Sequence, residues 1–252
     1  MKKFLYEGEM AKDMTPTLGD ARPLPSKVNA LHRIRSLGLP VSEVIDVGVR
    51  ECTAELISVF PNRKHHLFEP AAQFHQEIRH NYRALDHALY PIALSDENSD
   101  QFLVVTCLMR DGIPTHSSIS PIQRPVDGKE VIDCRPLAVR RFDSLGSGFA
   151  QDFLLKVDVD GFDLNVLRGF GSRLRDASIV IVETTFNTFV ERCRHIVDSG
   201  FALLDLVDLI YYGDFLYQFD SVFIRNDLVD SSVRPPIINF QTELWRQFSP
   251  RN

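Results

Sequence analysis

The chain has 252 residues, 44% of them apolar, and its 34 acidic and 28 basic side chains give a net charge of -6. This length allows one large domain or two small ones, with a core that needs no disulfide or structural metal. The acidic balance, with an isoelectric point near 5.7, lacks the basic footprint that nucleic acid or an anionic membrane surface requires, so neither is expected as a partner.

The spacing of the cysteines and the length of the apolar runs indicate where in the cell the protein is expected. The four cysteines form no CxxC pair, which excludes a zinc ribbon and a thioredoxin-type site and favours a reduced environment. The first apolar stretch ends at Glu7, too early for a signal peptide, and no run approaches the ~18 apolar residues of a membrane span. We therefore expect a cytoplasmic protein. The sequence does not decide whether it forms a homo-oligomer.

The N-terminal part differs in character from the rest. Residues 1–25 contain three prolines and no apolar periodicity, so they are expected to form an arm. Ser26 then caps a short amphipathic helix that ends at Gly38. We expect residues 1–40 to form a lid-like arm and helix, followed by one domain over residues 41–252.

Short apolar runs alternate with helical patterns after residue 40. This alternation predicts βαβ units, and hence a doubly wound α/β domain with a parallel sheet. Two further strands, 201–204 and 221–224, are expected to pair antiparallel through the turn region 211–214. The other expected strands are 44–47, 66–69, 90–94, 153–158 and 179–183, and the expected helices are 54–60, 71–85, 164–170 and 186–197.

The middle of the chain departs from this rhythm. Apolar runs at 102–105 and 131–132 flank a loop rich in Pro, Gly and Ser from about residue 110 to 128. Long loops inside compact domains are usually functional, so we expect residues 107–128 to form a substrate lid. His116 lies in this loop and is a candidate base or substrate ligand.

Acidic residues follow most of the predicted parallel strands. Ligands of open parallel sheets bind beyond the carboxyl ends of the strands. Glu69 lies 23 residues after Asp46, close to the ~20-residue offset at which an acid binds a ribose diol, and Gly48 lets a ligand approach the backbone. The pattern suggests a nucleoside ligand. Four of the five strand ends carry an acid, at Asp46, Glu69, Asp158 and Glu183.

The turn after the first strand argues against a dinucleotide. The sequence GVREC at 48–52 has one glycine and then Glu51, which would repel a pyrophosphate. A cationic nucleoside without phosphate tolerates the acidic rim, and S-adenosylmethionine is the common cofactor that meets this description. The residues expected to bind it are Asp46, Gly48, Arg50, Glu51, Glu69, Pro70, Ala93 and Leu94.

These motifs, in this order, resemble the FkbM-type S-adenosylmethionine-dependent methyltransferases. The resemblance covers roughly residues 42–225 and implies a class I methyltransferase fold, which is Rossmann-like, with a mostly parallel seven-stranded sheet and one antiparallel strand. Arg50 and Cys52 depart from the usual Asn and second Gly, and Asp160 and Asp163 replace two glutamates. The matching segments are VIDVG at 44–48, FEP at 68–70, RFDSL at 141–145, LKVDVDGFD at 155–163, VLRG at 166–169 and IVE at 181–183.

The resemblance implies transfer of a methyl group to a hydroxyl of a small molecule such as a sugar or secondary metabolite, with a nitrogen acceptor left open. Such an enzyme must place the nucleophile in line and exclude water. Asp158 is the leading candidate for orienting or deprotonating the acceptor, followed by Asp160 and Glu183, and His116 is the candidate from the loop. Each acid could instead cap a helix or lie in a solvated loop. The histidines lack metal-ligand spacing, so no metal is expected.

Two other functions compete with this interpretation. The sequence DVDG at 158–161 is also similar to the nucleophile motif of haloacid-dehalogenase-type phosphatases, but Phe162 replaces the expected Thr and no lysine follows Lys156. A methyltransferase-fold binding or regulatory protein is the non-enzyme alternative, motivated by the altered first motif. Binding of S-adenosylmethionine would exclude the phosphatase, and binding without turnover would favour the regulatory protein.

Overall fold

The computed structural model describes residues 25–107, 116–122, 130–230 and 233 of the chain. The main sheet has seven strands in the order β3-β2-β1-β8-β9-β11-β10. All run parallel except β11, which is antiparallel to both of its neighbours. The strands are β1 (Glu43–Val47), β2 (Lys64–Phe68), β3 (His87–Tyr90), β8 (Phe153–Val157), β9 (Ala177–Thr185), β10 (Phe201–Tyr212) and β11 (Phe215–Arg225). The expected sheet, with one antiparallel strand, is confirmed.

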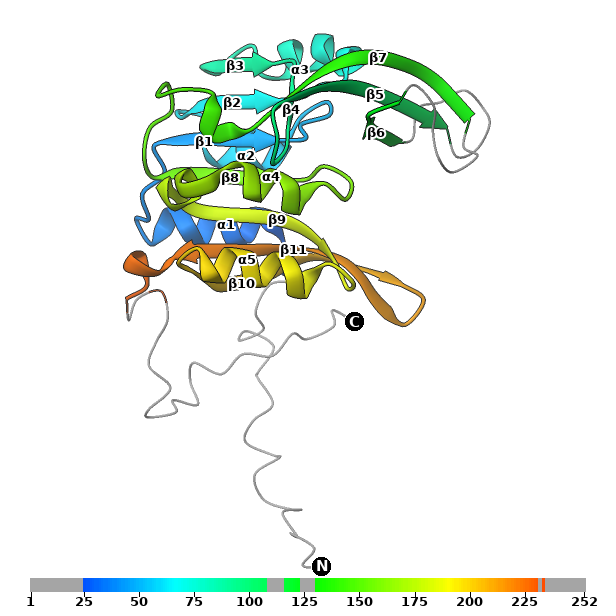
Figure 1. The fold of residues 1–252 in the computed structure, drawn as a ribbon. Helices are drawn as coiled ribbons and strands as arrows, with labels where there is room; N and C mark the ends of the chain where they lie inside the picture. Colours follow the sequence, from blue (N-terminus) through cyan, green and yellow to red (C-terminus); the bar gives the residue numbers. More distant parts are fainter. Residues whose placement is uncertain (1–24, 108–115, 123–129, 231–232, 234–252) are drawn as a thin grey trace, which may run out of the picture.

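Helices cover both faces of the main sheet, as the doubly wound prediction requires (Figure 1). The cluster of α1 and α2 side chains packs on one face, and α4 packs with the apolar cluster of the other. The helices are α1 (Lys27–Ser36), α2 (Ala54–Val59), α3 (His75–Asn81), α4 (Asp163–Gly169) and α5 (Phe189–Asp198). Short 3-10 segments are η1 (Ala72–Phe74), η2 (Phe142–Ser144), η3 (Gly171–Asp176) and η4 (Asn226–Leu228).

Helix α1 begins where the sequence predicts. Ser26 is extended, and its Oγ accepts a hydrogen bond from the Asn29 amide at 3.3 Å. Gly38 has a φ of +68°, a left-handed conformation that glycine adopts without strain and that ends many helices. The arm expected over residues 1–24 lies outside the described residues, so the lid-like role of residues 1–40 stays a prediction.

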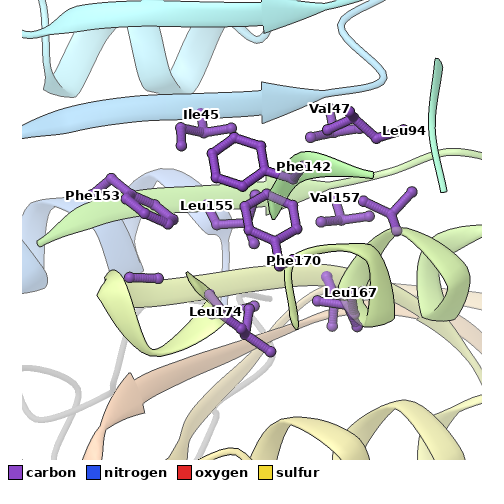
Figure 2. Close-up of a cluster of buried hydrophobic side chains, with 14 of the residues drawn as sticks. Ile45, Val47, Leu94, Phe142, Phe153, Leu155, Val157, Leu167, Phe170 and Leu174 are labelled. Carbon is purple, nitrogen blue, oxygen red and sulfur yellow. The ribbon is translucent and has the colours of Figure 1, made fainter. Parts of the chain in front are cut away.

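The face covered by α4 and α5 is apolar and rich in phenylalanine. Phe142 and Phe170 stack with ring centroids 4.0 Å apart, and Phe153 packs beside them (Figure 2). All three side chains are fully buried, as are Leu155 and Leu167. Burial of side chains of this size contributes about 1.5 to 3 kcal/mol each, so this cluster holds the helices to the sheet.

A second sheet branches from the first and carries the middle of the chain (Figure 1). Its order is β4-β7-β5-β6, with β4 parallel to β7 and the other pairs antiparallel. Its strands are β4 (Ala93–Leu94), β5 (Ser99–Cys107), β6 (His116–Ser120) and β7 (Glu130–Arg140).

Two sequence-based boundaries were wrong. The single strand expected at 90–94 is divided, because Pro91 has no N–H to continue the pairing of β3, and the chain then enters β4 of the second sheet. The helix expected at 71–85 is shorter, with η1 followed by α3 up to Asn81. Within the expected lid, residues 116–120 form a strand, and residues 108–115 and 123–129 lie outside the description, so a lid there stays a prediction.

None of the helices in the described ranges is long and apolar enough to cross a membrane.

Candidate active site

A cavity of about 370 Å³ lies at the carboxyl ends of β1, β2, β8 and β9, within the size range of small-molecule sites. The main sheet forms one side, here called the main-sheet wall, and the second sheet forms the other, the second-sheet wall. The main-sheet wall includes Gly48, Arg50, Glu69, Pro70, Asp158, Asp160 and Glu183. The second-sheet wall consists of Ala93, Leu94, Leu103, Val105, Ser118 and Ile119.

The turn after β1 depends on glycine. Gly48 has a φ of +83°, and a Cβ at this position would lie 1.9 Å from the backbone oxygen of Asp158. The turns after β1 and β8 therefore approach each other more closely than any side chain permits. Arg50 also has a positive φ, of +54°, at the position where the resemblance expects Asn.

Glu69 connects two backbone segments of the main-sheet wall. Its Oε2 accepts a hydrogen bond from the Arg50 amide and its Oε1 accepts one from the Ala71 amide, both at 2.8 Å. Burial raises the pKa of Glu69 above its usual range, although the two amide donors oppose the shift. Each carboxylate oxygen has a further acceptor direction, so the side chain has the capacity to accept bonds from the two hydroxyls of a ribose.

Asp46 lies beneath the cavity and does not line it. The residue is fully buried, and Lys156 Nζ lies 3.4 Å from its Oδ1 and 3.3 Å from Asp158 Oδ2. Burial alone would lower the pKa of Lys156, but Asp46, Asp158 and Asp220 together raise it above its usual value. One buried ammonium thus supports two strand-end carboxylates.

The loop after β8 is held by Asp163, at the start of α4. Its two oxygens accept hydrogen bonds from the Val159 amide at 3.1 Å and the Gly161 amide at 3.2 Å, and Arg192 Nη2 lies 2.7 Å from Oδ2. Asp163 therefore shapes the loop that carries Asp160, whose φ is +49°. At this position an aspartate in place of the family glutamate has a structural role.

The structure brings most of the predicted site residues to one cavity. Gly48, Arg50, Glu69, Pro70, Ala93, Leu94, Asp158 and Asp160 all line it. Glu51 does not, and its carboxylate lies 3.2 Å from Arg50 Nε. His116 is the first residue of β6, two positions before the cavity residue Ser118, and its side chain lies outside the description.

Sequence reasoning missed the apolar part of the lining. Leu103, Val105 and Ile119 come from the second sheet, and Phe74 and Ile92 come from the segments after β2 and β3. Alternate residues of a strand share a face, so Leu103 and Val105 could have been placed together, but the sequence did not indicate which face meets the site.

Six parallel strands with one antiparallel strand next to the edge form the class I methyltransferase fold, and the cavity lies at the carboxyl ends of the parallel strands. The FkbM methyltransferase domain matches residues 45–218. The chain belongs to this family, whose cofactor is S-adenosylmethionine.

Comparison with solved structures finds distantly similar proteins. One of them is a precorrin-6y C5,15-methyltransferase from Geobacter metallireducens, which is 13% identical and has a TM-score of 0.42. The match covers 82% of this chain and 92% of that chain. Another is Aeropyrum pernix fibrillarin in complex with S-adenosylmethionine, with 9% identity, coverages of 77% and 74%, and a TM-score of 0.40. Comparison with curated proteins finds no match.

The residues of the cavity fit this cofactor. Glu69 has acceptor capacity for the ribose, the apolar side chains of Phe74, Ile92 and Leu94 suit a purine ring, and the carboxylate-rich rim suits a sulfonium and an ammonium group. Gly48 itself lines the cavity, so the backbone of the first turn is accessible to the methionine end. The donor set therefore agrees with S-adenosylmethionine.

Proposed function

We propose that this chain is an O-methyltransferase that acts on a hydroxyl of a small molecule, such as a sugar or a secondary metabolite. The charge of the cavity is the observation that carries this proposal. Its lining presents four carboxylates and one guanidinium, from Arg50. Such a lining favours a neutral or cationic acceptor and disfavours the phosphate backbone of a nucleic acid.

The cofactor is assigned to the main-sheet wall. Glu69 would bind the ribose hydroxyls, Ala93 and Leu94 would flank the adenine, and Gly48 would lie under the methionine moiety, above the buried Asp46. Arg50, Glu51 and Pro70 complete the assigned binding set, with Arg50 and Pro70 supported by their place in the lining. S-adenosylmethionine supplies the electrophilic methyl group.

The acceptor is assigned to the space between Asp158, Asp160 and the second-sheet wall. Asp158 and Asp160 lie in the loop after β8 and would orient the hydroxyl, while the aliphatic wall excludes water. The segment that carries His116 would close over the acceptor. No nucleic acid or membrane partner is proposed, the protein would act in the cytoplasm, and assembly into a homo-oligomer is compatible with this function.

Mass spectrometry tests the proposal directly. Sugars and other small hydroxyl compounds are incubated with the protein and isotopically labelled cofactor, and label is expected in a methyl ether. Label in nucleic acid or in protein side chains would contradict the substrate class.

A second test addresses the assigned residues. Asp158→Asn is expected to lower turnover by about 100-fold or more, with cofactor affinity in calorimetry nearly unchanged, because a misplacement of the acceptor by about 1 Å costs roughly 10²-fold. Cofactor binding by the wild type without transfer to any acceptor would favour the regulatory alternative. If the wild type does not bind S-adenosylmethionine, both the methyltransferase and the regulatory protein are excluded.

A further inference from the structure

Glu183 is the acid of the cavity that the assignments above leave without a role. It lies near the carboxyl end of β9, a strand that is otherwise mostly apolar and buried, and its side chain lines the cavity. The side-chain amide of Gln218, on β11, donates a hydrogen bond to its Oε1. No lysine or arginine in the described ranges forms an ion pair with this carboxylate.

Asp158 differs from Glu183 in its counter-ion. Lys156 Nζ lies 3.3 Å from Asp158 Oδ2, and this ammonium is almost completely buried. This ion pair fixes the Asp158 carboxylate in the cavity lining, so Asp158 is suited to orient a hydroxyl by accepting its hydrogen bond.

The surroundings of Glu183 are mainly other carboxylates. The charged groups facing it are Asp158 and Asp160 after β8, Asp163 on α4 and Asp220 on β11. The nearest guanidinium, that of Arg192 on α5, donates to the backbone oxygen of Glu183 and pairs with Asp163. Burial, followed by these four carboxylates, raises the pKa of Glu183 to about 8. A base is most effective when its pKa lies near the working pH.

From this geometry, and resting on the proposed function, we propose that Glu183 is the general base that accepts the proton of the acceptor hydroxyl, while Asp158 orients that hydroxyl. The hydroxyl oxygen forms the new C–O bond as the C–S bond of the methyl donor breaks, and the electron pair of that bond stays on sulfur. The hydroxyl proton moves to the carboxylate of Glu183 and is released to water when the product leaves. Gln218 fixes one carboxylate oxygen by its hydrogen bond, so the other is available for the acceptor.

The test compares Glu183→Gln with Glu191→Gln, a control on the exposed side of α5. Both variants are expected to bind S-adenosylmethionine within about three-fold of the wild type in calorimetry. Infrared difference spectra between pH 6 and 10 should show one protonated carboxyl group that ionises near pH 8 in the wild type and in Glu191→Gln. This signal should be missing in Glu183→Gln. The titration needs no acceptor, so it decides the ionisation of Glu183 even before a substrate is found.

Turnover completes the test with the hydroxyl acceptor found by mass spectrometry. The wild-type kcat should rise with pH up to about 8 and then level off, whereas Glu183→Gln should be at least about 100-fold slower and lose this step. Asp158→Asn should be slower and should keep a step, moved to lower pH because one of the carboxylates that raise the pKa of Glu183 is gone. A signal near pH 8 that persists in Glu183→Gln, or a Glu183→Gln kcat within a few-fold of wild type, would overturn the inference. Failure of the wild type to bind the cofactor would refute the proposed function instead.

Discussion

The main-sheet wall presents four carboxylates and one guanidinium to the cavity, whereas the second-sheet wall presents mainly aliphatic side chains. The carboxylates lie at or near the carboxyl ends of β2, β8 and β9, and one of them, Asp158, pairs with the buried ammonium of Lys156. The second-sheet wall rests instead on a small apolar cluster that includes Leu103, Val105 and Val139. Changes to the first wall should therefore act through electrostatics and ligand affinity, and changes to the second through packing.

Removal of the buried ammonium should have the largest effect. Lys156→Met leaves the fully buried Asp46 without its counter-ion, and breaking a buried ion pair costs about 3 to 5 kcal/mol of unfolding free energy. Denaturant unfolding measures this loss, and cofactor affinity should fall as well. Adding Asp46→Asn should recover part of the stability, because the uncompensated charge is then gone. If the double variant is as unstable as the single one, the cost is due to packing.

The next largest effect is expected when an aliphatic side chain of the second-sheet wall is shortened. Leu103→Ala should cost about 2 to 3 kcal/mol of unfolding free energy, at the lower end for leucine, because the side chain is buried but belongs to a small cluster. Cofactor affinity should remain within about three-fold of wild type. Val131→Ala on β7 is the control and should lie within about 0.5 kcal/mol of wild type, since this side chain is 37% exposed. A large loss of cofactor affinity in Leu103→Ala would show that the two walls are not separable.

A charge-neutral replacement of Glu69 should have an intermediate effect, on ligand binding. Glu69→Gln presents one acceptor oxygen in place of two, so it cannot serve the amides of Arg50 and Ala71 and a ribose together. We expect a loss of about 1.5 to 3 kcal/mol in the binding of S-adenosylmethionine, roughly 10- to 100-fold in Kd. Isothermal calorimetry measures it, with Glu77→Gln on α3 as the control. Unchanged affinity would refute the ribose assignment.

The last expected effect is a pH dependence of stability and concerns Glu183. Its pKa is about 8 in the folded chain and near 4.5 when unfolded, so between these values the native state binds more protons. Stability contributed by this group is therefore full below about pH 4.5 and is lost as pH rises through 8. Glu183→Gln should gain thermal stability relative to wild type as pH rises from 5 to 8, as measured by Tm. A Tm difference that does not change with pH would contradict the buried, carboxylate-rich environment.

Strand ends were the part of the site that the sequence could predict. Short apolar runs located the parallel strands, and the rule that ligands bind beyond their carboxyl ends then selected Gly48, Glu69 and Asp158. Both steps are local, because a strand and the turn after it are encoded within about ten residues. The cap at Ser26 was predictable for the same reason.

Contacts between segments that are distant along the chain could not be predicted from the sequence. Lys156 stands inside an apolar run, and only the pairing of β8 with β1 shows that its ammonium meets Asp46. The second sheet depends on the pairing of β4 with β7, more than 40 residues later, and short apolar runs do not specify their partners. Pro91 was the one local signal that the third strand ends early.

The position of β4 affects how this fold can vary. Ala93 and Leu94 enter the cavity from the second sheet, and the chain just after them touches α4, where a Cβ on Gly169 would lie 1.9 Å from the backbone oxygen of Ser95. The base of the second sheet is thus fixed to the domain, while Cys107 and Glu130, at the far ends of β5 and β7, pair with each other. Changes in the outer part of the second sheet could therefore alter which acceptor binds. Such changes would leave the register of the parallel strands as it is.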